Sequence, residues 1–344
     1  MIRVGINGFG RIGRALTRII SDSPDIKLAA INEIDPLIDN HAYLFSYYSI
    51  YGRFKRKVEV KSSSNLLIDG KEVKFYSQED ISVVPWHRHD VDVVIDATGI
   101  HKNVLRSRRL LVRGIKKVVI THSPEEVDLT IILGANEEKY NSSKHHIISS
   151  SICDATAVAP VLKVLDKKFK IKNCFFTTLH PWLSYQNVLD GSLESVSSPG
   201  HYWRDYGLGR SGVGNLIPKD TTAAYATIKV LPRLKNKIEA ISFRIPTHIV
   251  ASSDITAIVK KKTTIQKVNS LFNQLSLSQP KTFGFVNDHL VSLDYLSSEK
   301  STFVDARWTR VLAKNIIKLV IWYDNEWGYS SRVLDIVRFI LKGN

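Results

Sequence analysis

The sequence predicts an α/β protein in which a doubly wound parallel sheet is joined to a second, α+β domain with a mixed or antiparallel sheet. Two observations support this class. Short apolar runs alternate with helical patterns over the first 150 residues, and longer strands follow after residue 173. The 344 residues also exceed the length that one core usually holds. We therefore expect two domains, over residues 1–151 and 152–324, with a C-terminal helix over 325–344 completing the first.

The first domain begins with a strand-like apolar run over residues 2–7. Residues 14–20 then carry apolar side chains at helical spacing, and a buried strand over 27–31 closes a βαβ unit. Further apolar runs suit central parallel strands that are covered on both faces, and they span residues 91–96, 117–120 and 129–133.

The second domain has a helical pattern over residues 158–165 and several longer strands, some with alternating polarity. The strands are expected over 174–179, 240–245, 253–259 and 316–322. Residues 190–215 form a long loop rich in Gly, Ser and aromatic residues, and loops of this length usually serve a function. An amphipathic helix over 331–340 is expected to return to the first domain.

The charge balance is strongly basic, with 48 Lys and Arg against 33 Asp and Glu, or +15 at pH 7. The basic residues are scattered in short clusters and match no nucleic-acid module, so we expect a solvated surface and no specific nucleic-acid partner. Two cysteines and the absence of an apolar leader indicate a cytoplasmic protein. No apolar run is long enough to span a membrane.

Gly8, Gly10 and Gly13 form a G-x-G-x-x-G string at a strand-to-helix turn, where backbone N–H groups can hold a pyrophosphate. Glu33 follows Gly13 by twenty residues, at the end of the second strand, where a carboxylate can bind the adenosine ribose. A carboxylate there would repel a 2′-phosphate, so the pattern favours NAD over NADP. The alternative is a glycine-rich structural turn. A Rossmann-type dinucleotide domain is the prediction.

Cys153 precedes the helical pattern of the second domain, and a cysteine at a helix N-terminus gains thiolate character. It is a candidate nucleophile, although most cysteines are small buried hydrophobes. His180 ends a strand at the long loop, where it is either the base for Cys153 or a structural histidine. The histidines at 87, 89, 145 and 146 lack partner ligands at metal-binding spacing, so no metal is expected.

Several strings together resemble the glyceraldehyde-3-phosphate dehydrogenase superfamily over essentially the whole chain. They are residues 5–14 (GINGFGRIGR), 97–99 (ATG), Cys153, His180, 243–247 (FRIPT) and 322–330 (WYDNEWGYS). Residues 31–33 (INE) and 51–54 (YGRF) look most like the erythrose-4-phosphate dehydrogenase branch.

The resemblance implies a tetrameric, NAD-dependent enzyme that oxidises a phosphorylated aldehyde through a thioester, with the long loop approaching a neighbouring subunit's cofactor. Cys153 then resembles the nucleophile and His180 its base. Cofactor contacts are implied for Arg11, Ile12, Thr98, Gly99, Thr121 and Asn325, and phosphate contacts for Arg210, Thr221 and Arg244. The alternative for each arginine is a surface ion pair.

The phosphate sites depart from the family pattern. Asp154 replaces the hydroxyl that usually follows the nucleophile, and Leu183 stands where a phosphate-binding threonine is usual. A carboxylate beside the thiolate should raise the pKa of Cys153 and repel inorganic phosphate, so that hydrolysis of the acyl-enzyme competes with transfer to phosphate. The alternative is that Asp154 points away and pairs with a basic neighbour or caps the helix.

A second function class is a non-catalytic dinucleotide-binding scaffold or regulator descended from this family. Joint retention of the candidate catalytic and binding residues argues against it, because a chain that had lost catalysis would have no physical reason to keep them. They are Cys153, His180, Arg210, Arg244 and Asn325.

Overall fold

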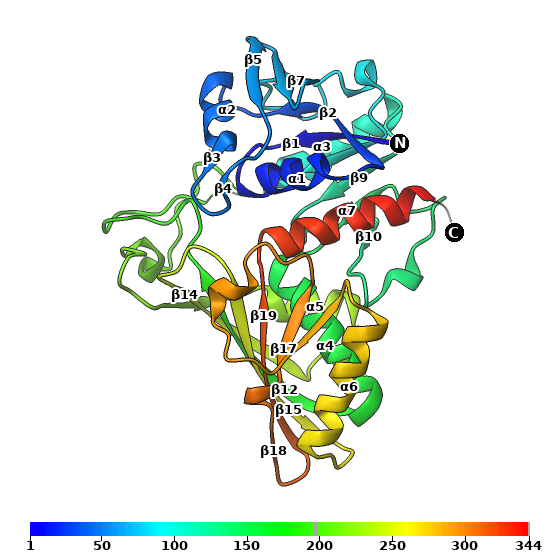
Figure 1. Ribbon diagram of the computed structural model, residues 1–344, viewed down its shortest axis with the longest axis vertical. Helices are drawn as coiled ribbons and strands as arrows, with labels where there is room; N and C mark the ends of the chain where they lie inside the picture. The colour runs from blue at the N-terminus through cyan, green and yellow to red at the C-terminus, as the bar shows by residue number, and fades with distance from the viewer. Residues whose placement is uncertain (196–197, 343–344) are drawn as a thin grey trace. The chain divides into compact units, whose positions relative to one another are not determined.

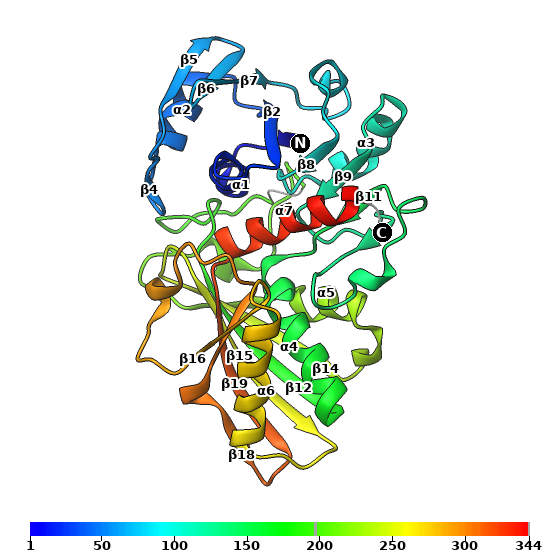
Figure 2. The same ribbon diagram turned by 45° about the vertical axis from the view of Figure 1, so that its right-hand side comes forward.

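The computed structural model describes residues 1–195 and 198–342, and the chain divides into two units (Figures 1 and 2). Unit 1 comprises Met1–Thr130, Tyr140–Ser150 and Val333–Asn344, and unit 2 comprises Ile131–Lys139 and Ser151–Arg332. The loop expected over 190–215 and the helix expected over 325–344 each include two residues that lie outside the described ones. Both predicted sheets are present, one in each unit, and the predicted fold class is confirmed.

Unit 1 is built on a nine-stranded sheet in the order β10-β11-β9-β8-β1-β2-β7-β6-β5. The pairs from β10 to β7 are parallel, whereas β5, β6 and β7 extend the edge as an antiparallel meander that the sequence analysis did not predict. The strands are β1 (Ile2–Asn7), β2 (Ile26–Asn32), β5 (Val58–Ser62), β6 (Asn65–Ile68), β7 (Lys71–Tyr76), β8 (Val93–Asp96), β9 (Lys117–Ile120), β10 (Leu129–Thr130) and β11 (Ile147–Ser149). The helices are α1 (Arg11–Ser21), α2 (Ile38–Ser46) and α3 (His101–Val112), and β3 (Tyr47–Tyr48) pairs with β4 (Gly52–Arg53).

The turn from β1 into α1 depends on two glycines. Gly8 has a φ of +95°, and a Cβ there would lie 2.9 Å from Cγ2 of Thr98. A Cβ on Gly13 would lie only 2.1 Å from the carbonyl oxygen of Gly8. A side chain on Gly8 would therefore strain the turn and clash with Thr98, and a side chain on Gly13 would force the helix away from the turn.

Unit 2 is built on an eight-stranded mixed sheet, in the order β13-β14-β12-β15-β19-β17-β16 with β18 beside β19. The strands are β12 (Ile171–Pro181), β13 (Ile217–Asp220), β14 (Ile238–Ile245), β15 (Ala251–Val259), β16 (Phe283–Val286), β17 (Thr302–Asp305), β18 (Arg310–Leu312) and β19 (Ile316–Tyr323). The helices are α4 (Cys153–Phe169), α5 (Ala223–Val230) and α6 (Ile265–Ser278), with α7 (Trp327–Lys342) leading out of the unit.

The core of unit 2 forms where α4 packs against the central strands β12, β15 and β19 (Figure 1). On β12, Cys174 and Phe176 are buried while Phe175 is exposed, as expected for a strand with one covered face. Val158, Val161 and Leu162 of α4 supply the opposing side chains.

The strand expected over 129–133 is shorter than predicted, since β10 ends at Thr130. Ile132 and Ala135 instead pack into unit 2, against Ala155 and Ala159 of α4 and Ala226 of α5. The apolar run is present, but its second part packs into the core of unit 2 and not into the sheet of unit 1. Among the described residues, no helix is both long and apolar enough to cross a membrane.

Candidate active site

Cys153 and His180 lie together in unit 2, at the start of α4 and the end of β12. The distance between Sγ of Cys153 and Nε2 of His180 is 3.5 Å. Ser151 precedes the helix with a φ of +63°, and its carbonyl accepts a hydrogen bond from the Tyr329 hydroxyl. This turn fixes the position from which the thiol enters the site.

The hydrogen bonds of His180 determine which ring nitrogen faces the thiol. Nδ1 lies 2.7 Å from the carbonyl oxygen of Pro181, and a carbonyl oxygen can only accept, so Nδ1 carries a proton. In the neutral ring, Nε2 is then the acceptor nitrogen, and it is the nitrogen that faces Sγ of Cys153. This is the arrangement that a general base for the thiol requires.

Asp154 turns its carboxylate toward the thiol. Oδ1 lies 3.6 Å from Sγ of Cys153 and 3.9 Å from Nε2 of His180, and it accepts a hydrogen bond of 2.9 Å from the Tyr323 hydroxyl at the end of β19. The alternative in which the carboxylate points away is therefore wrong. The acidic residue also occupies the first turn of α4, where the helix dipole favours it.

The surroundings of the thiol disfavour its isolated ionisation. Burial raises the pKa of Cys153 well above its ordinary value, the Asp154 carboxylate raises it further, and the Arg244 guanidinium opposes both. Burial likewise raises the pKa of Cys174 to about 12, with no charged partner nearby to offset it. Cys174 lies inside β12 and has no base beside it, which separates the two cysteines chemically.

Arg244 is brought beside His180 because the parallel strands β12 and β14 pair these two residues in register. Its side chain is buried, and its Nε has no hydrogen-bond partner in the structure. A buried guanidinium with an unused donor, close enough to influence Cys153, is a natural anion contact.

Lys219 is a further cation at this site that the sequence analysis missed. It lies on β13, and burial lowers the pKa of its ammonium, as does the charge of Arg244, while Asp154 raises it. Its Nζ donates to the carbonyl of Asp220. Lys219 lies 65 residues along the chain from Asp154, so no local sequence motif links the two residues. The pairing of β13 with β14 is what brings Lys219 to the site.

The remaining candidate phosphate residues lie in different settings. Arg210 is exposed, and its Nε forms an ion pair of 2.6 Å with Asp190, so the alternative of a surface ion pair describes it. Oγ1 of Thr221 accepts a hydrogen bond from the backbone N–H of Ala223 at the start of α5. Leu183 lies in the loop after β12, where its backbone N–H donates to Gln186.

In unit 1, the glycine turn leaves room for an anion at the start of α1. A Cβ on Gly10 would meet no atom within 4 Å, and Gly10 offers no side chain to cap the helix. Arg11 and Ile12 begin the helix here, at the terminus whose dipole attracts phosphate. Oε2 of Glu33 accepts the Phe9 N–H at 2.6 Å, which holds its carboxylate against the same turn.

The carboxyl ends of β1, β8 and β9 meet around Asp96. Oδ1 of this buried carboxyl accepts hydrogen bonds from Nδ2 of Asn7 (2.9 Å) and Oγ1 of Thr98 (2.7 Å), while the Thr121 hydroxyl donates to the Asp96 backbone carbonyl. Burial raises the pKa of Asp96 to about 6. Thr98 and Thr121 therefore shape the sheet edge at which α/β folds bind dinucleotides, and Gly99 follows with a φ of +72°.

Asn325, which lies in unit 2 just before α7, is buried and its Oδ1 has no hydrogen-bond partner in the structure. A buried acceptor without a donor is destabilising unless a ligand satisfies it. An amide N–H of a bound ligand, such as a carboxamide, would supply such a donor.

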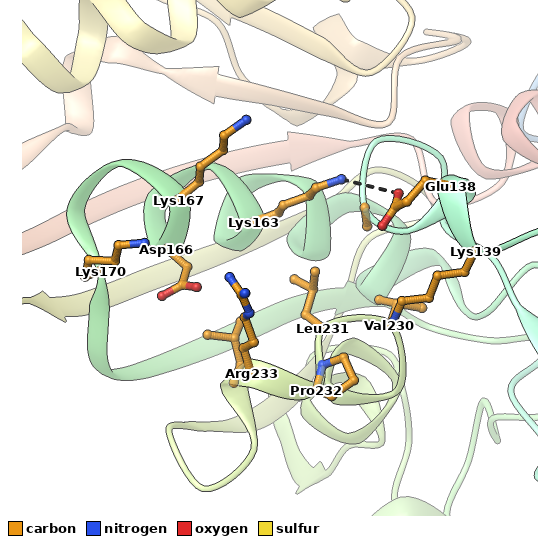
Figure 3. A pocket seen from close by; sticks show the side chains of 12 residues that line it. Glu138, Lys139, Lys163, Asp166, Lys167, Lys170, Val230, Leu231, Pro232 and Arg233 are labelled. Atoms are coloured by element: carbon orange, nitrogen blue, oxygen red, sulfur yellow. Dashed lines mark ion pairs between the residues drawn. The ribbon is translucent and has the colours of Figure 1, made fainter.

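A separate cavity of about 470 Å³ lies near the end of α4 in unit 2 (Figure 3). Lys163, Lys167 and Arg233 line it, and Lys163 lies 3.8 Å from Glu138. Its lining includes no cysteine, histidine or hydroxyl side chain, so it lacks the thiol and the imidazole of the site described above.

Comparison with known proteins gives one consistent family. Residues 2–104 match the family model described as the NAD binding domain of glyceraldehyde 3-phosphate dehydrogenase, and residues 152–325 match the model of its C-terminal domain. Glyceraldehyde-3-phosphate dehydrogenase 1 of Kluyveromyces marxianus and glyceraldehyde-3-phosphate dehydrogenase 3 of Saccharomyces cerevisiae are each 37% identical, over 99% of this chain and 100% of theirs. The cytosolic glyceraldehyde-3-phosphate dehydrogenase of Chlamydomonas reinhardtii is 36% identical, over 99% of this chain and 97% of its own.

Proposed function

The chain belongs to the glyceraldehyde-3-phosphate dehydrogenase family and is an NAD-dependent dehydrogenase of that type, and from this premise we propose that it oxidises a small phosphorylated sugar aldehyde through a thioester on Cys153. The observation that carries the proposal is the 3.5 Å approach of Sγ to Nε2 of His180, with Nδ1 held by the Pro181 carbonyl. A nucleophile beside an oriented base is the requirement for covalent aldehyde chemistry.

In the proposed reaction, His180 takes the thiol proton, Sγ of Cys153 adds to the aldehyde carbon, and the imidazolium passes the proton to the former carbonyl oxygen, giving a hemithioacetal. His180 then receives the hydroxyl proton of this adduct as the C–H bond breaks and a thioester forms. NAD, when bound, accepts the hydride. Attack by phosphate on the thioester carbon gives an acyl phosphate, and attack by water gives a carboxylic acid. In either case the C–S bond breaks and Cys153 leaves as the thiolate.

Asp154 affects the two ways of ionising the thiol very differently. With an effective dielectric near 20, a carboxylate 3.6 Å from a thiolate costs roughly 4.6 kcal/mol, and the same carboxylate 3.9 Å from an imidazolium contributes roughly 4.3 kcal/mol of attraction. The two effects nearly cancel when the proton moves from Cys153 to His180, but not when it leaves for solvent. We infer that the nucleophile forms as a thiolate–imidazolium pair.

The proposed anion site consists of Arg244 and Lys219. Burial of Arg244 and the unused donor on its Nε support binding of a substrate phosphate or of inorganic phosphate. Lys219 adds a second cation whose charge offsets that of Asp154. We propose that Arg210, which is paired with Asp190, contributes less than Arg244.

The second half-reaction is proposed to be mixed, with hydrolysis competing against transfer to phosphate. The support is the Asp154 carboxylate beside the sulfur that carries the acyl group, since an attacking phosphate dianion would approach a fixed negative charge. A phosphate titration comparing wild type with Asp154→Thr tests this. The variant should gain phosphate-dependent turnover, and equal phosphate dependence in both proteins would contradict it.

The experiment for the whole proposal is a panel of phosphorylated and unphosphorylated aldehydes, followed by NADH absorbance with and without inorganic phosphate. Glyceraldehyde 3-phosphate and erythrose 4-phosphate are the two leading substrates. Phosphorylated aldehydes should be oxidised with the higher kcat/KM, because Arg244 and Lys219 are positioned for their charge. Absence of turnover with every aldehyde, with NAD binding intact, would favour the non-catalytic scaffold instead.

We further infer that Glu33 gives preference for NAD over NADP, and calorimetry with both cofactors measures it. Its carboxylate is fixed by the backbone N–H groups of Phe9 and Ile34, so it cannot turn away from a 2′-phosphate without losing both bonds. Equal or tighter binding of NADP would contradict this role.

A cytoplasmic homotetramer is also proposed. Phe175 of β12 and Ile241 of β14 are more than half exposed on the sheet of unit 2, which is costly for large apolar side chains unless another copy covers them. Light scattering of the purified chain should give four times the 38.9 kDa monomer mass. A monomer at micromolar concentration would contradict the proposal.

A further inference from the structure

Cys153, Asp154 and His180 present three metal-binding atoms to one point. Sγ lies 3.6 Å from Oδ1 of Asp154 and 3.5 Å from Nε2 of His180, and Oδ1 and Nε2 are 3.9 Å apart. Among the described residues, they form the one group of three such side chains close enough to share an ion. The sequence analysis expected no metal, because it considered only the histidines at 87, 89, 145 and 146 as ligands.

The distances match those required by zinc. Zinc bonds of about 2.3 Å to sulfur and about 2.0–2.2 Å to nitrogen and oxygen, at tetrahedral angles, place the ligand atoms roughly 3.4 to 3.6 Å apart. The two distances from sulfur already have these values, and the third needs to shorten by about half an ångström. We propose that these three side chains bind one Zn²⁺ ion, with a water molecule in the fourth position.

Neighbouring groups hold two of the ligands in the required orientation. The Pro181 carbonyl accepts the Nδ1 proton of His180 and so leaves Nε2 as the ligand atom. The Tyr323 hydroxyl donates to Oδ1 of Asp154, a bond that leaves further lone pairs on the carboxylate. Such outer partners are characteristic of protein zinc sites and strengthen metal binding.

The charge of the site suits a divalent ion, and the ligand types favour zinc over a harder cation. A thiolate and a carboxylate together neutralise a divalent ion, so Arg244 and Lys219 would face an uncharged centre. Sulfur and imidazole ligands suit Zn²⁺, whereas Mg²⁺ and Ca²⁺ require oxygen ligands. Binding displaces the thiol proton of Cys153 to solvent and forms the Zn–S, Zn–N and Zn–O bonds without any redox change.

Zinc binding has a functional consequence that rests on the proposed function. The Cys153 thiolate and Nε2 of His180 would both be bound to metal, so neither could add to an aldehyde or accept its proton. Zinc would therefore hold the enzyme in a reversible inactive form. The metal site itself depends only on the geometry, and binding is measured without substrate.

The test uses the full-length chain freed of metal by a chelator that is then removed. Calorimetry with Zn²⁺ gives stoichiometry and affinity, and absorbance during titration with Co²⁺ detects a sulfur-to-metal charge-transfer band. We expect one ion per chain and a band that disappears in Cys153→Ser. Asp154→Thr should weaken Zn²⁺ binding by at least about tenfold, and Tyr323→Phe by about tenfold.

Cys174→Ser is the matched control, since that thiol is buried in β12 away from the cluster and its loss should leave Zn²⁺ affinity and the cobalt band unchanged. Thermal unfolding and NAD binding establish that each variant is folded. Unchanged Zn²⁺ affinity in Asp154→Thr, or a cobalt spectrum without thiolate character, would overturn the proposal. Neither outcome depends on turnover, so failure of zinc binding is distinguishable from failure of the proposed enzyme activity.

Discussion

Replacing His180 should lower the reactivity of the Cys153 thiol far more when Asp154 is present than when Asp154 is replaced. In wild type, the carboxylate stabilises an imidazolium at 3.9 Å and opposes a thiolate at 3.6 Å. Loss of the imidazole removes the favourable interaction and leaves the unfavourable one. At an effective dielectric near 20, the lost attraction is roughly 4.3 kcal/mol, which corresponds to a ceiling of about 10³-fold in thiolate population.

The assay is a double-mutant cycle on the rate of alkylation by iodoacetamide at pH 7. The four proteins carry either Asp154 or Asp154→Thr, with either His180 or His180→Asn, all in a Cys174→Ser background so that one thiol reacts. Iodoacetamide is uncharged, so Arg244 does not bias the encounter. We expect His180→Asn to slow alkylation at least tenfold more in the Asp154 background than in the Thr background.

The coupling would be refuted by equal slowing in the two backgrounds. That result would mean that the carboxylate and imidazole act independently, and that the thiolate forms by losing its proton to solvent. Thermal unfolding of all four proteins provides the control, because a loss of folding in one variant would mimic a loss of reactivity.

Three further outcomes follow from the same structure. Cys153→Ser should abolish aldehyde oxidation measured by NADH absorbance, while Cys174→Ser should reduce only the melting temperature, because only Cys153 has a base within 3.5 Å. Arg244→Gln should raise KM for a phosphorylated aldehyde at least tenfold, and more than Arg210→Gln does, since Arg210 is already paired with Asp190; the reverse ranking would contradict the proposed anion site. Burial raises the pKa of Asp96 in the folded protein from 3.8 to about 6, so its contribution to the free energy of unfolding should fall by about 3 kcal/mol as pH rises from about 4 to 6. Asp96→Asn should remove this dependence on pH, measured by chemical denaturation at several pH values. An unchanged dependence in the variant would contradict the assignment.

The sequence predicted the local parts of the fold well because their signals are local. The strand, glycine turn and helix at the N-terminus needed only the spacing of apolar residues and glycines, and β1 and α1 lie where these indicate. The run over 129–133 was partly misassigned because an apolar run does not say which core will bury it. The β5–β7 meander was missed because short polar strands carry little periodicity.

The candidate site could be predicted only in part, because its residues come together from distant parts of the chain. Cys153 and His180 were identified from helix and strand ends, but their 3.5 Å approach depends on packing between α4 and β12, which no pattern encodes. Lys219 and Tyr323 reach the site through strand pairing over long separations, so sequence reasoning overlooked both. The resemblance implied a phosphate contact for Arg210, yet its guanidinium forms an ion pair with Asp190, a partner that only the folded loop reveals.

Asp154 and Lys219 act together on the electrostatics of the site. With Asp154 alone, the carboxylate would offset the charge of Arg244 and leave the anion site close to neutral. Lys219 restores one net positive charge, while burial and the charge of Arg244 make its ammonium easier to deprotonate. We therefore expect affinity for a substrate phosphate to be preserved, although the negative charge beside the sulfur remains. Binding of the aldehyde and attack by inorganic phosphate depend on different parts of this charge pattern, so a change at one residue can alter the second step without weakening the first.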